Sequence, residues 1–470
     1  MQVGLQWIDQ KAPELIALAQ AIWEYAEVGL KEERSARAQA AVLEQEGFDV
    51  RLGMAGMPSA LVASFGEGKP SIGFLGEYDA LPGLSQRASP YQDPVCEGGP
   101  GHGCGHNLLG VASLAAAVAL KREMEAGRLT GTVRYYGCPA EETLVGKVFM
   151  AKHGLFDDLD AAITWHPGAL NTAWYGSSLA MNSARFSFYG RTAHGAAAPH
   201  MGISALDAVE LMNVGVNYLR EHIIQEARIH YVITRGGSEP NVVPPYAEVW
   251  YYVRAPRRAD VDEIYARVLK IAEGATLMTG ARMKVEFLTG VYEVLANPVL
   301  TELLEESLRK VGPPQFTEEE KAFARELEQS FDLGQKASAA RSRGLPPEYG
   351  EISLHEEVAP GLDKGRIMPG STDVGDVSWI VPTGQLTTAC EVFGSAGHSW
   401  QIAATSGMSI GHKGMLTAAR AMALAGYELA TRPELLRQAK KAFERDTAGQ
   451  PYVCPLPADL MEPAPQLVDH

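Results

Sequence analysis

Residues 71–82 have the sequence SIGFLGEYDALP, in which a short apolar segment runs directly into an acidic loop. The segment 71–75 is apolar and bounded by glycine, a pattern typical of a buried strand. Glu77 and Asp79 follow immediately, so two carboxylates lie just beyond this segment. The stretch therefore predicts a buried strand followed by an acidic loop.

Strands and helices alternate on both sides of this stretch. Apolar residues at helical spacing predict helices over 12–25, 32–46 and 108–124, and short apolar segments predict strands over 60–65, 132–137 and 160–165. Strands that alternate with helices indicate an open α/β sheet. We therefore expect an open twisted sheet in a first domain formed by residues 1–181 and 294–470.

The pattern changes near Met181. A first strand is followed by predicted helices over 204–221 and 259–278 and by predicted strands over 230–235, 247–254 and 283–288. This is the pattern of a self-contained α+β unit, which we expect to be a second domain, residues 182–293, inserted into the first. Residues 312–350 are charged, with one predicted helix over 317–329, and are expected to form a surface excursion. A helix over 414–429 is expected to be the final one.

Composition and charge exclude several classes of function. The chain has 470 residues, and 41 Lys and Arg against 57 Asp and Glu give a formal charge of -16, which argues against a nucleic-acid partner. The first ten residues do not resemble a secretory signal, and the apolar run 108–120 is too short to span a bilayer. The five cysteines are odd in number and widely scattered, which favours a reducing compartment. We expect a cytoplasmic protein without a membrane partner.

Side chains that can bind metal recur at the predicted strand ends. Cys104 and His106 lie two residues apart among glycines, Glu141 and Glu142 follow one strand, and His166 follows another. Each signal alone has an ordinary explanation, such as an incidental cysteine in a glycine-rich loop or paired glutamates on an exposed helix. Together they place metal-competent groups on one edge of one sheet, where ligands and catalytic groups collect in open α/β folds. The joint pattern predicts a metal site at this edge.

A further histidine can complete the set from a distant part of the chain. His398 follows the apolar segment 386–393, and a distant final ligand is normal when an inserted domain interrupts the first one. His412 is the alternative. It lies at the start of the last predicted helix, beside Lys413, where a capping or surface role is favoured.

The order of these motifs resembles a family of metallopeptidases. The motifs are Asp79-Ala80-Leu81-Pro82, Gly103-Cys104-Gly105-His106-Asn107, Glu141-Glu142, His166-Pro167, Gly190-Arg191-Thr192-Ala193-His194 and His398-Ser399. The family contains aminoacylases, hippurate hydrolases, auxin-conjugate amidohydrolases and carboxypeptidase-G-type enzymes, and the resemblance extends over nearly the whole chain. Within it, the tracts 370–378 and 398–401 look most like the B subunits of aminobenzoyl-glutamate hydrolases.

The resemblance implies a fold, a reaction and a cofactor. It implies a phosphorylase/hydrolase-like catalytic metal-binding domain and a ferredoxin-like inserted domain that serves as lid and dimer interface. The implied reaction is hydrolysis of the amide bond of an N-acyl amino acid, most closely aminobenzoyl-glutamate or a similar conjugate. It further implies two divalent ions, zinc or manganese, and a homodimer or a heteromer with a paralogous subunit.

The resemblance also implies a role for each residue of the site. The metal ligands would be Cys104, His106, Glu142, His166 and His398. Glu141 would be the general base, and Asp79 would accept a hydrogen bond from a ligand imidazole. His194 would stabilise the oxyanion, often from the neighbouring subunit, and Asn241 and Arg254 would hold the substrate carboxylate, although a structural salt bridge is an equal explanation for Arg254. Family members often have Asp or His at the position of Glu77, which is therefore left out of the ligand set.

Three other functions remain open. A dipeptidase or another N-deacylase would use the same site and can be separated only by substrate profiling. A partner subunit without catalysis would be indicated by a missing Glu141 or a broken ligand set, and all these residues are present. A cysteine hydrolase that uses Cys104 with His166 would keep its activity in the presence of chelators.

Overall fold

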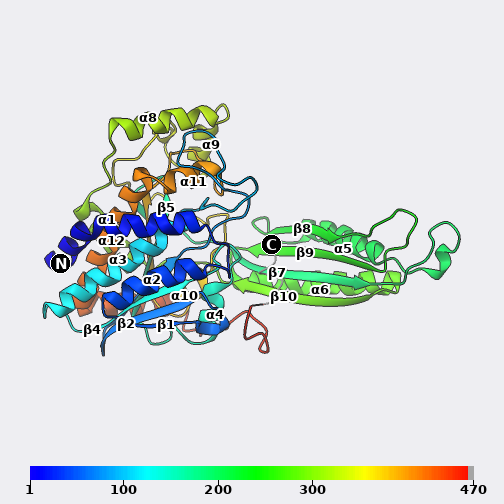
Figure 1. The fold of residues 1–470 in the computed structure, drawn as a ribbon. Helices are drawn as coiled ribbons and strands as arrows, with labels where there is room; N and C mark the ends of the chain where they lie inside the picture. Colours follow the sequence, from blue (N-terminus) through cyan, green and yellow to red (C-terminus); the bar gives the residue numbers. More distant parts are fainter. Residues whose placement is uncertain (464–470) are drawn as a thin grey trace.

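The computed structural model describes residues 1–463 and consists of two units (Figure 1). The larger unit contains a seven-stranded sheet and the smaller one a four-stranded sheet. The smaller unit projects from one side of the larger one (Figure 1). Residues 464–470, which belong to the predicted first domain, lie outside the described part of the chain.

The larger unit is built on a mixed sheet. Its strands are β1 (Asp49–Leu52), β2 (Leu61–Glu67), β3 (Ser71–Glu77), β4 (Gly131–Cys138), β5 (Ala161–Gly168), β6 (Thr172–Ala173) and β11 (Thr383–Ala389). They lie in the order β1-β2-β4-β3-β5-β11-β6. The four strands β4, β3, β5 and β11 are parallel, and β1, β2 and β6 pair antiparallel at the two sides. The carboxyl ends of four adjacent strands therefore meet at one edge, which positions the site.

Helices surround this sheet. They are α1 (Gln2–Tyr25), α2 (Glu33–Gln45), α3 (His106–Glu125), α4 (Gly146–Lys152), α7 (Pro298–Val311), α8 (Glu318–Leu327), α9 (Gln335–Ser342), α10 (Val374–Ser378), α11 (Trp400–Ser406), α12 (Ser409–Thr431) and α13 (Pro433–Asp446). Among residues 1–463, no helix combines the length and the apolar composition that crossing a membrane requires.

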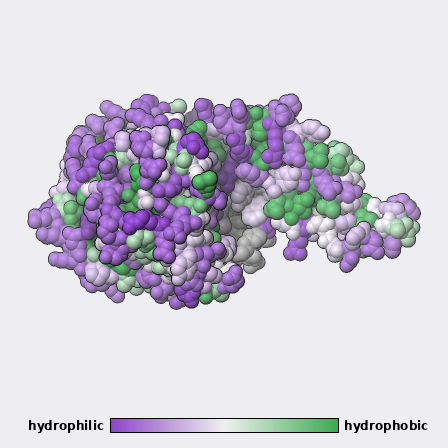
Figure 2. All heavy atoms as spheres, turned by 90° about the horizontal axis from the view of Figure 1, so that it is seen from above, coloured by the Kyte–Doolittle hydropathy of each residue, from purple (hydrophilic) through white to green (hydrophobic). Residues whose placement is uncertain are grey.

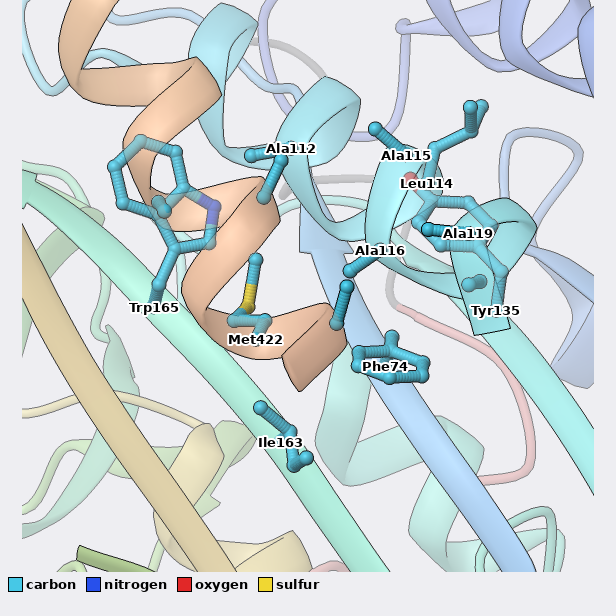
Figure 3. Packing of buried hydrophobic residues seen from close by; sticks show 14 of the residues in the cluster. Phe74, Ala112, Leu114, Ala115, Ala116, Ala119, Tyr135, Ile163, Trp165 and Met422 are labelled. Atoms are coloured by element: carbon cyan, nitrogen blue, oxygen red, sulfur yellow. The ribbon is translucent and has the colours of Figure 1, made fainter. Parts of the chain in front are cut away.

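The main core lies where α3 and α12 cover the centre of the sheet. Figure 3 shows Phe74 of β3 and Ile163 of β5 beneath alanines of α3 and Met422 of α12. Phe74 and Met422 are fully buried, and Ile163 is 1% exposed. The small side chains of α3 bring this helix close to the sheet, and full burial of each large apolar side chain stabilises the fold by roughly 1.5–3 kcal/mol.

The smaller unit is an antiparallel sheet covered by two helices. Its strands are β7 (Ala180–Tyr189), β8 (Arg228–Arg235), β9 (Tyr246–Ala255) and β10 (Arg282–Val291), in the order β10-β7-β9-β8, and its helices are α5 (Ala205–Leu219) and α6 (Arg258–Thr279). Burial alternates along β9, and Val249 and Val253 pack in the core with the two helices. Because side chains of a strand alternate between faces, Tyr252 and Arg254 lie on the opposite face.

The expectation of an open α/β sheet with an α+β unit inserted in the chain is confirmed. The domain boundaries predicted at 181/182 and 293/294 stay predictions. The expectation of a last helix over 414–429 is wrong, because α13 follows α12. The sequence carries the signal of this helix, because its apolar residues Leu435, Ala439 and Ala442 recur at helical spacing among charged residues.

The expected surface excursion over 312–350 is more integrated than its charged sequence indicates. Leu327 at the end of α8 packs with Val392, and Ala340 of α9 packs with Leu345 and Phe393. Both contacts lie just beyond the carboxyl end of β11. The excursion therefore covers part of the edge where the parallel strands end.

The packing of Phe74 generates a test of this core. We expect Phe74→Ala to lower the free energy of unfolding by about 3–5 kcal/mol, because it leaves a cavity between β3 and the covering helices. The measurement is the midpoint of denaturant-induced unfolding. The matched control is Tyr91→Ala, at a side chain that is 60% exposed, with an expected change within about 0.5 kcal/mol. Equal losses in the two variants would contradict the assigned core.

Candidate metal centre

Five segments distant in sequence deliver metal-competent side chains to the carboxyl edge of the larger sheet. They are the end of β3, the loop after β4, the end of β5, the start of α3 and the loop between β11 and α11. In three groups the possible ligand atoms all lie within 4.8 Å of one another. The groups are Cys104, His106 and His166; Cys104, Glu142 and His398; and Glu77, His106 and Glu141. The structure therefore brings together all five ligands predicted from the sequence.

Short distances connect the members of the cluster. Cys104 Sγ lies 3.4 Å from His166 Nε2, and His398 Nε2 lies 3.2 Å from Glu142 Oε2. On the other side, His106 Nε2 lies 3.3 Å from the Oε2 atom of Glu77. Cys104 and His106 each belong to two of the three groups, so the cluster is one continuous site.

Two imidazoles, the buried His106 and the half-buried His166, are held with the same nitrogen facing the cluster. Nδ1 of His106 donates to Asp79 Oδ1 at 2.8 Å, and Nδ1 of His166 donates to the carbonyl of Pro167 at 2.7 Å. Each bond fixes the tautomer and leaves Nε2 with a free lone pair. Metal-ligating histidines are usually oriented in this way, by a carboxylate or a carbonyl on the remote nitrogen.

Asp79 also fixes the loop that carries the paired glutamates. Its Oδ2 accepts a hydrogen bond from the backbone N–H of Glu142 at 2.8 Å. Burial alone would raise the pKa of Asp79, but His106 and the N–H of Glu142 lower it below its usual value. Asp79 therefore acts as an ionised acceptor between two parts of the site.

Two glycines allow the loop before α3 to pass close to its neighbours. A side chain at position 103 would meet the backbone nitrogen of Ser399 at 3.3 Å, so Gly103 permits the approach of the loop that carries His398. Gly105 has φ 75° and lies against Pro167, beside the ligand strand β5. The glycines around Cys104 therefore have two roles: Gly103 lets the backbone of the neighbouring loop come close, and Gly105 adopts a left-handed backbone conformation.

Unpartnered atoms in the cluster fit a cation. Among the residues that the structure describes, Nε2 of His106, Oε2 of Glu77 and Oε1 of Glu142 are buried and have no hydrogen-bond partner. Buried polar atoms normally have a hydrogen-bond partner, so three neighbouring buried atoms without one need an explanation. A thiol, three imidazoles and carboxylates form a donor set that suits a divalent transition metal.

Glu141 lies beside the ligands without belonging to the predicted ligand set. Its Oε2 lies 4.0 Å from His106 Nε2, and the residue is 8% exposed. Burial raises the pKa of Glu141 well above its usual value, and the carboxylates of Glu77 and Asp373 add to this effect. A carboxylate with a raised pKa can both accept and return a proton, as a general base must.

The environment of Cys104 disfavours a free thiolate. Burial and the nearby Glu142 raise the pKa of the Cys104 thiol, whereas nucleophilic cysteines need a lowered pKa. Metal binding deprotonates a thiol and would supply the missing positive charge. The surroundings are those of a ligand rather than of a cysteine nucleophile paired with His166.

A buried ion pair behind the cluster was missed from the sequence. Lys147 of α4 is fully buried, and its Nζ lies 2.6 Å from Glu77 Oε1 and 2.6 Å from Asp373 Oδ1. Burial by itself lowers the pKa of Lys147, but Asp373 and Glu77 outweigh burial and raise it well above its usual value. One oxygen of Glu77 is thus held by the ammonium while the other faces His106. A lysine in the apolar run 144–151 was the available signal.

Two pockets meet at the cluster and share Cys104, His166, Trp174, Met368 and His398. The first, named here the apolar pocket, has a volume of about 320 Å³ and is lined chiefly by Ala169, Leu170, Leu345, Leu362 and Ile402. The second, named the Arg254 pocket, has about 370 Å³ and contains Glu141, Arg254, Ser371 and Thr372. A substrate bound across the cluster can extend one group into each pocket.

Of the remaining predicted residues, Arg254 lines a pocket at the cluster and the others do not. Arg254 lines the Arg254 pocket, and its guanidinium lies over the ring of Tyr252, 5.4 Å from the ring centroid; among the described residues it forms no ion pair with a carboxylate. His194 and Asn241 are exposed and lie side by side, with the N–H of Gly195 donating to the Asn241 carbonyl, but they line neither pocket. His412 lies in α12, half-buried, and belongs to none of the three groups.

Curated relatives match the chain over most of its length. The B subunit of the p-aminobenzoyl-glutamate hydrolase of Escherichia coli (strain K12) is 44% identical over 454 residues, 94% of each chain. The Xaa-Arg dipeptidase of Mus musculus is 28% identical over 93% of this chain and 90% of that protein.

Solved structures share the fold. An aminobenzoyl-glutamate utilization protein from Klebsiella pneumoniae has a TM-score of 0.61 at 18% identity, over 90% of this chain and 98% of the other. A dinuclear metal binding peptidase of the M20 family from Bacillus subtilis has a TM-score of 0.57 at 16% identity, over 90% and 99%. The family described as Peptidase family M20/M25/M40 matches residues 73–350, more than half of the chain. The expectation of a hydrolase is therefore confirmed, and the chain belongs to peptidase family M20/M25/M40.

Proposed function

We propose that this protein hydrolyses the amide bond of N-acyl amino acids, with p-aminobenzoyl-glutamate and similar aryl conjugates as its leading substrates. The observation that carries the proposal is the convergence of Cys104, His106, Glu142, His166 and His398 around unpartnered buried atoms, with Glu141 beside them. The 44% identity to the B subunit of a p-aminobenzoyl-glutamate hydrolase supports this choice of substrate.

The five ligands would hold two divalent ions, for which we propose zinc or manganese. When bound, such ions polarise the amide carbonyl, lower the pKa of water and neutralise the charge that develops on the carbonyl oxygen. The chain itself orients the ligands through Asp79 and the carbonyl of Pro167. Lys147 Nζ lies 2.6 Å from one oxygen of Glu77 and leaves the other facing His106, which makes Glu77 a candidate for a further ligand.

Glu141 would carry the proton. In the proposed step, its carboxylate removes a proton from the attacking water and then gives it to the nitrogen of the leaving amino acid. The position of Glu141 supports this double role, because its Oε2 atom lies 4.0 Å from His106 Nε2, beside the predicted ligands.

The substrate carboxylate would lie in the Arg254 pocket. Arg254 is half-buried there, without a carboxylate partner in the part of the chain that the structure describes, and Ser371 and Thr372 lie in the same pocket. A guanidinium binds a carboxylate through two parallel hydrogen bonds. The acyl group would then extend into the apolar pocket on the other side of the cluster.

We propose that His194 and Asn241 reach the site of a neighbouring subunit. Both are exposed in the smaller unit and lie outside the pockets of their own chain. β8 is an edge strand with exposed Val232 and Ile233, and hydrophobic residues gather on this unit (Figure 2). Such an edge can pair with another strand. A homodimer fits these features, and so does a heteromer with a paralogous chain, since the relatives also include the A subunit of a p-aminobenzoyl-glutamate hydrolase.

Two further proposals concern substrate range and cell compartment. The likeness to Xaa-Arg dipeptidases supports dipeptide hydrolysis at the same site as a second candidate function. All five cysteines are free thiols, which fits the cytoplasmic localisation expected from their spacing.

Metal removal and one substitution test the proposed reaction. We expect chelated protein to lose hydrolysis of p-aminobenzoyl-glutamate and zinc or manganese to restore it. Glu141→Gln should lower kcat by about 10²–10⁴-fold with unchanged metal content, because the variant lacks the proton acceptor. Metal analysis and steady-state assays provide both readouts, with Glu97→Gln at an exposed loop as the matched control. Full activity of chelated protein, or of Glu141→Gln, would remove the proposed mechanism.

The hydrogen bond from His106 to Asp79 generates a separate test. Asp79→Asn should weaken metal affinity by about 10–100-fold, because the amide orients His106 less well and leaves its ring less basic. Competition with a chromophoric chelator measures the affinity. Asp157→Asn, at an exposed aspartate, is the control. Unchanged affinity in Asp79→Asn would show that the bond has no influence on the metal.

A further inference from the structure

One carboxyl group in the apolar pocket is not used by the proposed mechanism. Glu391 lies two residues beyond the end of β11, on the edge of the sheet that carries the metal-competent cluster. It is 6% exposed and lines the apolar pocket. Among residues 1–463, no donor lies within hydrogen-bond or ion-pair distance of its carboxyl group.

The other polar groups of this pocket are already engaged or too distant. Thr387 donates its hydroxyl to the carbonyl of Leu170, and Asp363 accepts hydrogen bonds from the N–H groups of Tyr175 and Gly176. The guanidinium of Arg343 lies over the ring of Phe393, 5.9 Å from its centroid, and attracts Glu391 only from a distance. Glu391 is therefore a free acceptor in apolar surroundings.

The position of Glu391 leaves its carboxyl group available to a ligand in the apolar pocket. Burial raises the pKa of Glu391 to about 7, although Arg343 opposes the rise. Because Glu391 lines the pocket and its carboxyl group has no donor from the described chain, its oxygens can accept a hydrogen bond from a group that enters the pocket.

The backbone places Glu391 beside the strand that carries His166. The N–H of Cys390 donates to the carbonyl of Gly168 at 2.8 Å, and Gly168 lies two residues after His166. Glu391 therefore lines the same pocket as the predicted ligands Cys104, His166 and His398.

We propose that Glu391 determines acyl-group specificity by accepting a hydrogen bond from an amino group at the far end of the acyl moiety, such as the 4-amino group of aminobenzoyl conjugates. This inference rests on the proposed function and adds to it a specific residue and a specific group of the substrate. The aromatic ring fills the apolar pocket, its amino group reaches Glu391, and the amino acid occupies the Arg254 pocket.

Paired substrates test this assignment. We expect the metal-loaded protein to have a kcat/KM for 4-aminobenzoyl-glutamate at least about tenfold above that for benzoyl-glutamate, because only the former offers a donor to Glu391. Glu391→Met should bring the ratio close to one, mainly by weakening the amino substrate. Glu391→Gln, which keeps an acceptor oxygen, should retain part of the preference. Glu351→Met, at an exposed glutamate, is the matched control and should keep the preference in full.

Binding of the free acyl acids tests the role of Glu391 even if a variant loses turnover. Calorimetric titration with 4-aminobenzoate and with benzoate should show tighter binding of the amino compound to the unaltered protein and equal binding to Glu391→Met, at equal metal content. A preference that survives in Glu391→Met, or no preference in the unaltered protein, would overturn the inference. If the metal-loaded protein hydrolyses neither conjugate but shows the expected binding difference, the proposed reaction fails and the role of Glu391 stands.

Discussion

The carboxylate of Asp79 holds the site together. One of its oxygens accepts from His106 at the start of α3, and the other accepts from the backbone of Glu142 in the loop after β4. Both bonds point away from the cluster, so they orient ligands without competing for them. The glycine-rich loop, the paired glutamates and the end of β5 can converge only because this buried acceptor fixes two of them relative to the sheet.

The convergence creates an unusual concentration of negative charge. Glu32, Glu77, Asp79, Glu141 and Asp373 are buried near one another, and the half-buried Glu142 lies beside them. In the described part of the chain, Lys147 is the only buried lysine paired with any of them. Carboxylates in low dielectric are stable only when paired, hydrogen-bonded or protonated. Two divalent cations would supply four positive charges where the unpartnered atoms meet. Burial raises the pKa of Glu141, and the carboxylates of Glu77 and Asp373 add to this effect.

Much of this arrangement was predictable because it is local in sequence. The strands β3, β4 and β5 can each be predicted from a short apolar segment. Glu77, Glu142 and His166, which can bind metal, lie at the ends of these segments or within a few residues of them. Parallel strand ends meet at one edge, so the clustering of Glu77, Glu142 and His166 follows from the topology, whereas Cys104 reaches the same edge in the loop just before α3. His398 was found through its motif, since no rule of spacing links it to the others.

What could not be predicted depends on contacts between remote segments. Lys147 finds its two carboxylates only when α4 packs beside the tract that contains Asp373. Glu391 has no significance until residues 343–368 cover the end of β11 and form the apolar pocket. The charged sequence of the excursion over 312–350 resembles a solvated loop, because few of its side chains are apolar. Helix α13 differs from this excursion, because its apolar residues recur at helical spacing and its sequence alone could have predicted it.

The central claim is that two cations share the cluster around Cys104. The most direct measurement is anomalous diffraction at the zinc and manganese edges from crystals of the metal-loaded protein. The account predicts two peaks about 3.5–4 Å apart, both within bonding distance of the cluster and at least one in contact with the sulfur of Cys104. A single peak, or peaks remote from Cys104 and His398, would contradict it.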